Sequence, residues 1–571
     1  MDLKDESYYV VLPWRWVLGE RPFVHEQTLF QVPAMLEYPF LKLFGLLRGN
    51  DPTGLILYTR HLYLLMMLGV AAAVFLLLRR LVRWQLALVI SCVSLTYIFW
   101  ATPQLSYDTM ALAFLTLGVV FGAWVVVLGK GRGYALVSGA GFGVAVVAYP
   151  TLLFVMPFFA VLFVFAHGRR AAAVLAQGAF ADPPDPEGPP TGRLAWRALS
   201  AWAAGGALLL VPVGALLVSF GLENVRRSWQ NTIVGAHAVG QLGGASKAVA
   251  VAQGFWWLVT WRPLVIVAAL LIYLVYRRWP RLGRALLASV PLVLWAAAQR
   301  PFLDASGYVQ AYVFLAPYLF LFIPRSKRET GARLLIWVWA SAMLAGVMTA
   351  YTSAVGYVNS AVGLAPAVMV SGLFLAWALE AVTEAAPGGA FSPRRARAPW
   401  LALVVLVAIV GVTLAFQFEF QQHLVPYRTL TSRFDSGPWW GIKVTPERRA
   451  QVDSFAAGLR ATARPGDKLL VLYVAPGYYL FWPGPIASYA YWMGSDPAGG
   501  LPPAEIAYFR NHNVVPTLVV HLTLTAGLTP AEISAGNAGL GYPAALVRPG
   551  YVIYRKPAGE TTAEVLARLP Q

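Results

Sequence analysis

The sequence contains little cysteine and few charged residues, and both shortages narrow the class of protein that it can encode. A single cysteine, Cys92, among 571 residues leaves no disulfide within the chain and no thiolate metal site. Only 12% of the residues are charged, whereas a soluble protein carries about 25%. Acidic residues are the scarcer kind, with 26 Asp and Glu against 44 Lys and Arg. Such low charge over this length indicates a membrane protein with several spans.

Apolar runs are what the sequence has in abundance. Hydrophobic residues make up 58% of the chain, and a spanning helix needs about 17–25 mostly apolar residues. Two runs are too long for one helix, so we expect 133–166 to split near Pro150 and 334–379 to turn near 351–359. We predict about twelve spans, at 59–79, 84–101, 109–129, 133–148, 150–167, 199–219, 260–277, 285–299, 309–323, 333–352, 363–383 and 399–417.

The basic residues lie mainly on one side of these spans. Alternate connectors hold twenty Lys and Arg residues, whereas the connectors on the other side hold five. The positive-inside rule makes the first set cytoplasmic, so everything after about residue 418 is expected outside. This sidedness explains the net charge of +18 without nucleic-acid binding. The five outward residues are Arg226, Arg227, Lys247, Arg262 and Arg300.

The tail differs in character from the rest of the chain. Short β-like runs, "KLLVLYVA" (468–475), "TLVVHLTL" (517–524) and "GYVIYRK" (550–556), alternate with helical patterns. The helix expected over 445–463 has Thr445 as N-cap before Pro446. We therefore predict three parts: an extracytoplasmic loop over 1–58, a transmembrane helical domain over 59–418, and an extracytoplasmic α/β domain over 419–571 that serves as a lid or docking platform.

The first residues, "MDLKDESYY", combine an acidic cluster with two tyrosines. The charge pattern places Asp2, Asp5 and Glu6 outside, yet no apolar span precedes them. We therefore expect one helix to be missing from this sequence, which gives thirteen spans in the natural protein. The loop 1–58 then follows that helix, and its stretch "YYVVLPWRWVLGERPF" suits a helix lying in the membrane interface.

Four sequence stretches follow one another in an order that is found in a known family. "DESYY" (5–9) stands before "YTRHLYLLMMLGVAAAVFLLLRRL" (58–81), "ATPQLSYDTMALAFLTLGVVFGAW" (101–124) and "GRGYALVSGAGFGVAVVAYPTLLFVMPF" (131–158). The order resembles the GT-C superfamily of membrane glycosyltransferases, in particular bacterial protein O-mannosyltransferases and aminoarabinose transferases. The resemblance implies a GT-C-like fold that moves a sugar from a polyprenyl-phosphate donor to a glycan, lipid or protein acceptor. It places the reaction at the outer face of a bacterial plasma membrane.

An inverting transfer of this kind needs a base close to the lipid. We predict Asp5 as the general base, with Glu6 and Asp2 as the next candidates, because burial beside a membrane raises the pKa of a carboxyl group. A solvated end of the chain is the alternative for this cluster. Tyr8 and Tyr9 are candidates for substrate contact through the same motif.

The leaving phosphate needs cations. Guanidinium groups suit phosphate, so Arg60 at the outer end of a span is the first candidate, followed by Arg226, Arg227 and Arg300. Contact with lipid headgroups is the alternative for each.

Three further polar residues lie on the predicted outer side. His25 and Glu26 could orient the acceptor or, with the carboxylates, bind a divalent cation such as Mg²⁺ or Mn²⁺, although no metal-ligand spacing is present and a solvent-facing pair is the alternative. Asp108 could contact substrate or compensate the dipole at the start of a helix.

Two other functions compete with sugar transfer. A transporter or flippase would place ionisable residues within the spans and often carries internal repeats, and neither is found in the sequence. A polymerase or ligase of surface polysaccharide shares the lipid-linked donor but typically relies on a large outward loop late among the spans. Here the long acidic and aromatic loop comes first, which favours the transferase.

Overall fold

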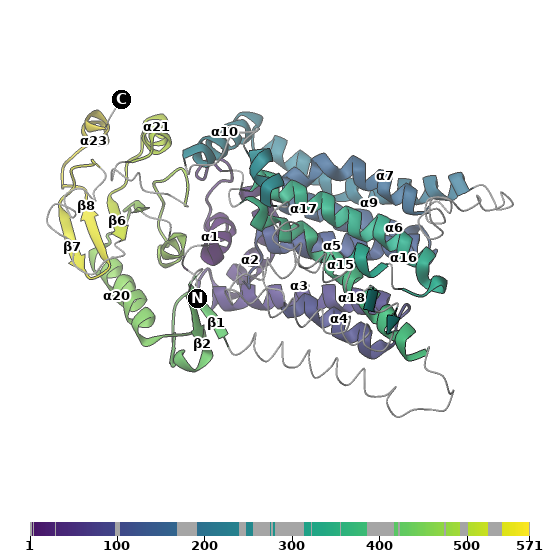
Figure 1. Cartoon of the computed structure of the whole chain (residues 1–571). Coiled ribbons are helices and arrows are strands. Elements are labelled where there is room, and N and C mark those ends of the chain that lie inside the picture. The colour runs from purple at the N-terminus through teal and green to yellow at the C-terminus, as the bar shows by residue number, and fades with distance from the viewer. Residues whose placement is uncertain are drawn as a thin grey trace.

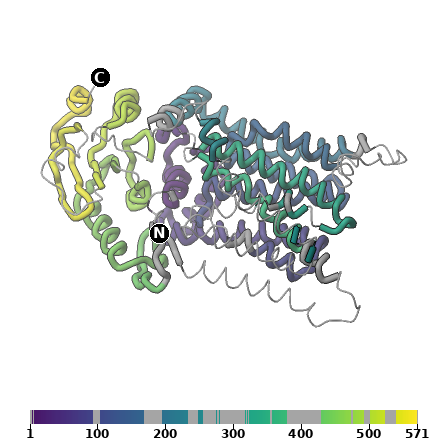
Figure 2. Tube along the Cα trace, in the orientation of Figure 1, coloured from purple at the N-terminus to yellow at the C-terminus, as the bar shows by residue number. Residues whose placement is uncertain are grey.

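The computed structural model describes residues 3, 5–28, 30–96, 103–167, 191–238, 247–254, 274–275, 278–279, 313, 315–320, 323–353, 356–384, 416–420, 423–472, 475–491, 501–522 and 539–569. A bundle of long helices forms one part of the molecule, and a smaller α/β domain lies at one end of it (Figure 1). Helix α1 (Asp5–Val17) lies between the two parts and contacts residues 476–481 of the α/β domain (Figure 2).

The bundle confirms most of the spans that fall on described residues. Six stretches are long and apolar enough to cross a membrane: Leu55–Leu78, Tyr107–Val126, Pro150–His167, Ala195–Ser219, Arg325–Thr352 and Gly356–Trp377. The split at Pro150 and the turn before residue 360 are both confirmed. The spans predicted at 260–277, 285–299 and 399–417 lie almost wholly outside the described residues. The helical elements are α3 (Leu55–Leu78), α4 (Trp84–Thr96), α5 (Tyr107–Val126), α6 (Arg132–Ala148), η2 (Pro150–Val155), α7 (Met156–His167), α9 (Thr191–Ser219), α10 (Leu222–Ala238), α15 (Leu315–Leu319), η4 (Arg325–Lys327), α16 (Arg328–Leu334), η5 (Leu335–Trp339), α17 (Ala340–Thr352), η6 (Gly356–Asn359) and α18 (Ser360–Glu384).

Glycine lets the backbones of α6 and its neighbours approach closely. A Cβ atom on Gly139 of α6 would lie 1.7 Å from the carbonyl oxygen of Trp202, and one on Gly205 of α9 would lie 2.0 Å from that of Leu136. Small residues at such crossings are typical of helices that pack in a membrane, where association depends on close van der Waals contact. The glycine-rich sequence of α6 therefore serves packing between helices.

The described connectors among those predicted to be cytoplasmic, at 79–83, 127–131 and 323–328, lie at the end of the bundle away from the α/β domain (Figure 1). Trp377 Nε1 donates to the carbonyl of Leu81, just after α3, at 3.0 Å. Arg333 Nη1 donates to the carbonyl of Val126, at the end of α5, at 2.9 Å. One bond thus joins α18 to the connector after α3, and the other joins α16 to the end of α5, in agreement with the connectors that the charge pattern groups together.

The α/β domain has a sheet with the strand order β5-β6-β8-β7. Strands β5 (Leu469–Leu472) and β6 (Leu518–Leu522) are parallel, with Leu469 opposite Leu518, and β8 (Tyr551–Arg555) and β7 (Ala544–Arg548) continue the sheet antiparallel. The three predicted strands are confirmed, and α20 (Pro446–Thr462) starts at the predicted cap, where the Thr445 hydroxyl accepts from the Arg448 N–H. The other elements are β1 (Phe416–Phe420), β2 (His423–Pro426), η8 (Tyr427–Thr429), β3 (Ser432–Arg433), β4 (Lys443–Val444), η9 (Pro476–Phe481), α21 (Pro503–His512) and α23 (Thr562–Arg568).

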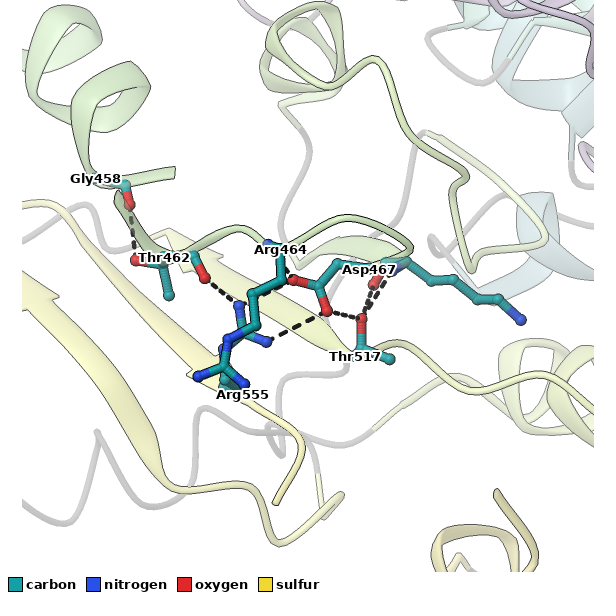
Figure 3. A network of polar contacts seen from close by, with 7 residues as sticks. Gly458, Thr462, Arg464, Asp467, Thr517 and Arg555 are labelled. Atoms are coloured by element: carbon teal, nitrogen blue, oxygen red, sulfur yellow. Dashed lines mark hydrogen bonds and ion pairs between the residues drawn. The ribbon is translucent and has the colours of Figure 1, made fainter. Parts of the chain in front are cut away.

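A polar network around Asp467 joins α20 to this sheet (Figure 3). The carboxylate of Asp467 accepts from the Arg464 N–H at 2.7 Å and from the Thr517 hydroxyl at 2.8 Å. Arg555 on β8 donates to the same carboxylate at 2.9 Å and also bonds the carbonyl of Thr462 at the end of α20. The carboxylate is 8% exposed, so its partners replace the water that it loses on burial.

Helix α1 is part of a core that it shares with the α/β domain. Val10, Val11 and Leu12 are 0% exposed, and they belong to one hydrophobic cluster with residues of η9, α20 and the sheet. The interfacial position expected for 8–23 is therefore wrong for α1, because protein covers its apolar side chains on every side. Helix α2 (Gln31–Arg48) fits that expectation better, since it leaves four large apolar side chains exposed: Phe40, Leu43, Leu46 and Leu47.

Candidate functional site

The first turns of α1 meet the N-terminal part of α3 through an ion pair. Arg60 donates from Nε to Glu6 Oε1 at 2.6 Å and from Nη2 to Glu6 Oε2 at 2.9 Å. The Glu6 side chain is 1% exposed and that of Arg60 is 22% exposed. Two residues predicted separately for the site thus form one two-point contact, which fixes the plane of the Arg60 guanidinium against the Glu6 carboxyl group.

An aromatic cluster extends from α1 across the ends of the bundle helices. The rings of Tyr8 and Tyr9 lie 5.6 Å apart, and Tyr9 lies 5.4 Å from Tyr107 at the start of α5. Tyr107 in turn lies 5.5 Å from Tyr149, just before η2, and 5.8 Å from Phe30. Edge and tilted contacts at these distances stabilise beyond simple burial, so the cluster fixes α1 against α5.

Asp108 lies beneath this cluster and is nearly buried, at 5% exposure. It does not cap its helix, because Ser106 is the N-cap of α5 and forms a capping box with Thr109. Instead Asp108 Oδ1 accepts from the amide of Asn359 at 3.3 Å, and the same amide lies 3.4 Å from the Tyr149 hydroxyl. Asp108 therefore lies in the first turn of α5, where its charge can compensate the helix dipole, and it also bonds an amide from the segment before α18.

Glu26 is buried, at 1% exposure, and this corrects the alternative that it faces solvent. Its Oε1 accepts from the hydroxyls of Thr28 at 2.8 Å and Tyr8 at 3.3 Å, and its Oε2 accepts from the N–H of Tyr491 at 2.7 Å. Burial raises the pKa of Glu26 to about 8, against the opposite effect of these hydrogen bonds. Both oxygens already have partners, so Glu26 holds the loop to the α/β domain and is poorly placed as a metal ligand. His25 is partly exposed, and its Nδ1 accepts from the N–H of Arg21 at 2.8 Å.

The remaining predicted residues lie apart from the Glu6–Arg60 pair or outside the described residues. Arg226 and Arg227 are on α10, where Arg226 pairs with Glu223 at 2.8 Å and Arg227 lies 3.8 Å from the same carboxylate. Asp5 is the first residue of α1, but its side chain lies outside what the structure describes, as do Asp2 and Arg300.

Metal-binding geometry is absent from the part of the chain that the structure describes. No group of three or more His, Cys, Asp or Glu side chains there could hold an ion. The described polar side chains at the outer end of the bundle therefore supply hydrogen bonds and one guanidinium. Dependence on Mg²⁺ or Mn²⁺ stays a prediction.

Sequence reasoning missed several residues that the structure brings to this region. Tyr149 and Asn359 contact one another although 210 positions separate them, and no sequence motif predicts this contact. Arg15, Glu20 and Tyr491 form a second buried group on the far side of α1. The one available signal was position, because Tyr149 and Asn359 lie at the two breaks predicted within long apolar runs.

No protein-family model and no curated protein sequence matches the chain. Two similar solved structures are the archaeal oligosaccharyltransferase AglB from Archaeoglobus fulgidus, in complex with an inhibitory peptide and a dolichol-phosphate, and ArnT from Cupriavidus metallidurans. AglB matches with 12% identity and a TM-score of 0.44 over 91% of this chain and 65% of its own length. ArnT matches with 13% identity and a TM-score of 0.41 over 100% of this chain and 96% of its own. Both are GT-C superfamily members, the superfamily that the N-terminal motifs resemble. Because both TM-scores are below 0.5, these similarities carry no argument about activity.

Proposed function

We propose that this protein is a membrane glycosyltransferase that takes a sugar from a polyprenyl-phosphate donor and transfers it to an acceptor at the outer face of a bacterial plasma membrane. One observation carries the proposal. The acidic start of α1 is fixed by the Glu6–Arg60 pair at the N-terminal end of α3, a helix long and apolar enough to cross a membrane, and we propose that this end lies at the level of a lipid-bound phosphate on the outer side. A carboxylate and a guanidinium at that level suit a donor whose tail stays in the bilayer.

The proposed reaction is a single displacement with inversion. The acceptor hydroxyl or amine attacks the anomeric carbon, the bond from that carbon to the phosphate oxygen breaks, and polyprenyl phosphate leaves with the electron pair. The Asp5 carboxylate takes the proton of the acceptor, which is the role of a general base. Arg60 lies where its guanidinium can stabilise the charge that develops on the phosphate.

The geometry separates the roles of the acidic residues. Both carboxyl oxygens of Glu6 are engaged by Arg60, so Glu6 orients that guanidinium and has no oxygen turned to an acceptor. Asp108 is buried beside Asn359 and Tyr149 and suits orientation of the sugar or acceptor by hydrogen bonds. Asp5 therefore stays the first candidate for the base, with Asp2 next.

The proposal is tested with purified protein in nanodiscs, a donor labelled in its sugar, and a membrane extract as the source of acceptor. We expect wild type to release polyprenyl phosphate and to move the label to an acceptor fraction, and Asp5→Asn to lose this turnover. EDTA, followed by added Mg²⁺ or Mn²⁺, decides whether an ion is needed. Asp51→Asn is the matched control, because Asp51 is exposed in the loop before α3 and its carboxylate accepts from Thr53 of the same loop.

The same preparation distinguishes the rival functions. Movement of intact donor across proteoliposomes without cleavage of the sugar–phosphate bond would identify a flippase and overturn the proposal. Addition of repeating units to a growing glycan would identify a polymerase. Equal turnover by wild type and Asp5→Asn would remove Asp5 from the mechanism.

A further inference from the structure

We infer that residues 476–491 of the α/β domain position the acidic first turn of α1, so the C-terminal domain is a working part of the active site. Gly477 and Arg15 are the positioning residues. The inference rests on the proposed function, because it assigns that domain a part in the same site.

The first contact lies at the start of α1. The N–H of Gly477 in η9 donates to the carbonyl of Leu3 at 3.0 Å. A Cβ atom at Gly477 would lie 2.7 Å from Ser7 Oγ, 2.9 Å from Ser7 Cβ and 3.0 Å from Leu3 Cδ2. Real Cβ atoms do not approach other atoms this closely, so only glycine allows η9 to rest directly on the first turn.

The second contact holds the other end of α1. Arg15 is 1% exposed, and its guanidinium donates to the carbonyls of Trp482 at 2.8 Å and Gly484 at 2.6 Å. It also pairs with Glu20, which neutralises the buried charge. One side chain thus fixes the helix axis against the backbone that follows η9.

The third contact holds the loop after α1. The N–H of Tyr491 donates to Glu26 and its hydroxyl bonds Glu20, while the carbonyl of Tyr489 accepts from the N–H of Gln27 at 2.7 Å. Segment 476–491 therefore contacts α1 and its loop before, within and after the helix.

The Glu6–Arg60 pair approaches from the bundle, and η9 approaches through Leu3 and Ser7. Glu6 and Ser7 are neighbours on the first turns of α1, so an outward displacement of η9 changes how Glu6 meets Arg60. The distance between a carboxylate and its reaction partner must be held to a few tenths of an ångström for effective catalysis. This is why a residue with no contact to substrate can control the rate.

The test is a double-mutant cycle of Gly477→Ala and Ser7→Gly in the full chain. Gly477→Ala is expected to lower kcat at least tenfold, to leave the KM for the labelled donor within threefold, and to speed amide exchange over residues 5–10. Ser7→Gly removes the atoms that the new methyl group would strike, so the double variant is expected to recover to within threefold of Ser7→Gly alone. Arg15→Met is expected to resemble Gly477→Ala, and Arg15→Lys to lose less.

Asp467→Asn is the control, because it weakens the same domain at the network of Figure 3, away from α1. It should lower the melting temperature while kcat of the folded protein and exchange over residues 5–10 stay as in wild type. An equal loss of kcat in Asp467→Asn, or wild-type kcat and exchange in Gly477→Ala, would overturn the inference. Amide exchange can be measured whether or not the protein transfers sugar. Unchanged exchange over residues 5–10 in Gly477→Ala would therefore contradict the positioning role independently of the proposed function.

Discussion

Tyr491 and Glu26 are joined across 465 positions by a 2.7 Å hydrogen bond from the backbone N–H of the tyrosine to the carboxyl group of the glutamate. Tyr8 of α1 donates to the other oxygen of that carboxyl group at 3.3 Å. Glu26 therefore connects the first loop, α1 and the α/β domain at a single buried point.

This buried carboxyl group makes stability depend on pH. Burial raises the pKa of Glu26 from its ordinary value of 4.5 to about 8, so the folded state keeps a proton that the unfolded state releases. Its contribution to stability is then fully present below about pH 4.5 and is lost as the pH rises to 8. We compare wild type with Glu26→Gln between pH 5 and pH 8. The stability advantage of wild type, measured as the difference in unfolding free energy, should fall by on the order of a few kcal/mol over this range, and the difference in melting temperature should fall with it. Parallel melting curves for the two proteins over this range would contradict the prediction.

Arg60 should matter for both folding and turnover. Arg60→Met leaves Glu6 buried without its partner, which costs about 3–5 kcal/mol in a fully buried pair and less here, because Arg60 is 22% exposed. The double variant Glu6→Gln with Arg60→Met should regain part of that stability. Its turnover should stay low, since the cation for the phosphate is gone. Thermal unfolding by tryptophan fluorescence and donor cleavage measure the two effects, and recovery of turnover in the double variant would refute the phosphate role.

Asp5 is expected to affect chemistry and not folding. General-base catalysis contributes about 10²–10⁴ in rate, so Asp5→Asn should lower kcat within that range. Its melting temperature should match that of Asp51→Asn within a degree or two. A loss of turnover in proportion to a loss of folded protein would instead assign Asp5 a structural role.

The crossing of α6 and α9 supplies a prediction about the bundle alone. Gly205→Ala places a methyl group 2.0 Å from the carbonyl oxygen of Leu136, so the helices must separate and the protein should be destabilised by several kcal/mol. Gly214→Ala on the same helix is the matched control. A Cβ atom there meets nothing within 4 Å, and alanine should stabilise the helix by about 0.5–1 kcal/mol. Equal melting temperatures for the two variants would show that the close approach is not required.

The sequence was informative where one physical rule dominates. Long apolar runs predict spans such as Leu55–Leu78, and charge sidedness predicts which connectors share an end, since both follow from transfer between water and lipid. Short β-like runs and a capped helical pattern likewise predicted β5, β6, β8 and α20. These features depend on local composition alone.

The candidate site was harder to predict from the sequence, because its contacts join segments that are far apart in the chain. Asp5, Glu6 and Arg60 were selected by motif, but the pairing of Glu6 with Arg60 needed the structure. Helix α1 was misjudged for the same reason. Its aromatic and apolar residues suit a membrane interface equally well as a protein core, and only the α/β domain decides between them. Asn359 and Tyr149 carry no local signal for the contact that they make.

The shared core of α1 and the α/β domain has a consequence for biosynthesis. Arg15 can bond Trp482 only after the ribosome has added a further 467 residues. At about 5–20 residues per second that interval is roughly 20–90 s, during which the side of α1 that packs on η9 and the sheet has no permanent cover. A nascent chain stalled before η9 would therefore leave these side chains of α1 uncovered and open to cellular proteases.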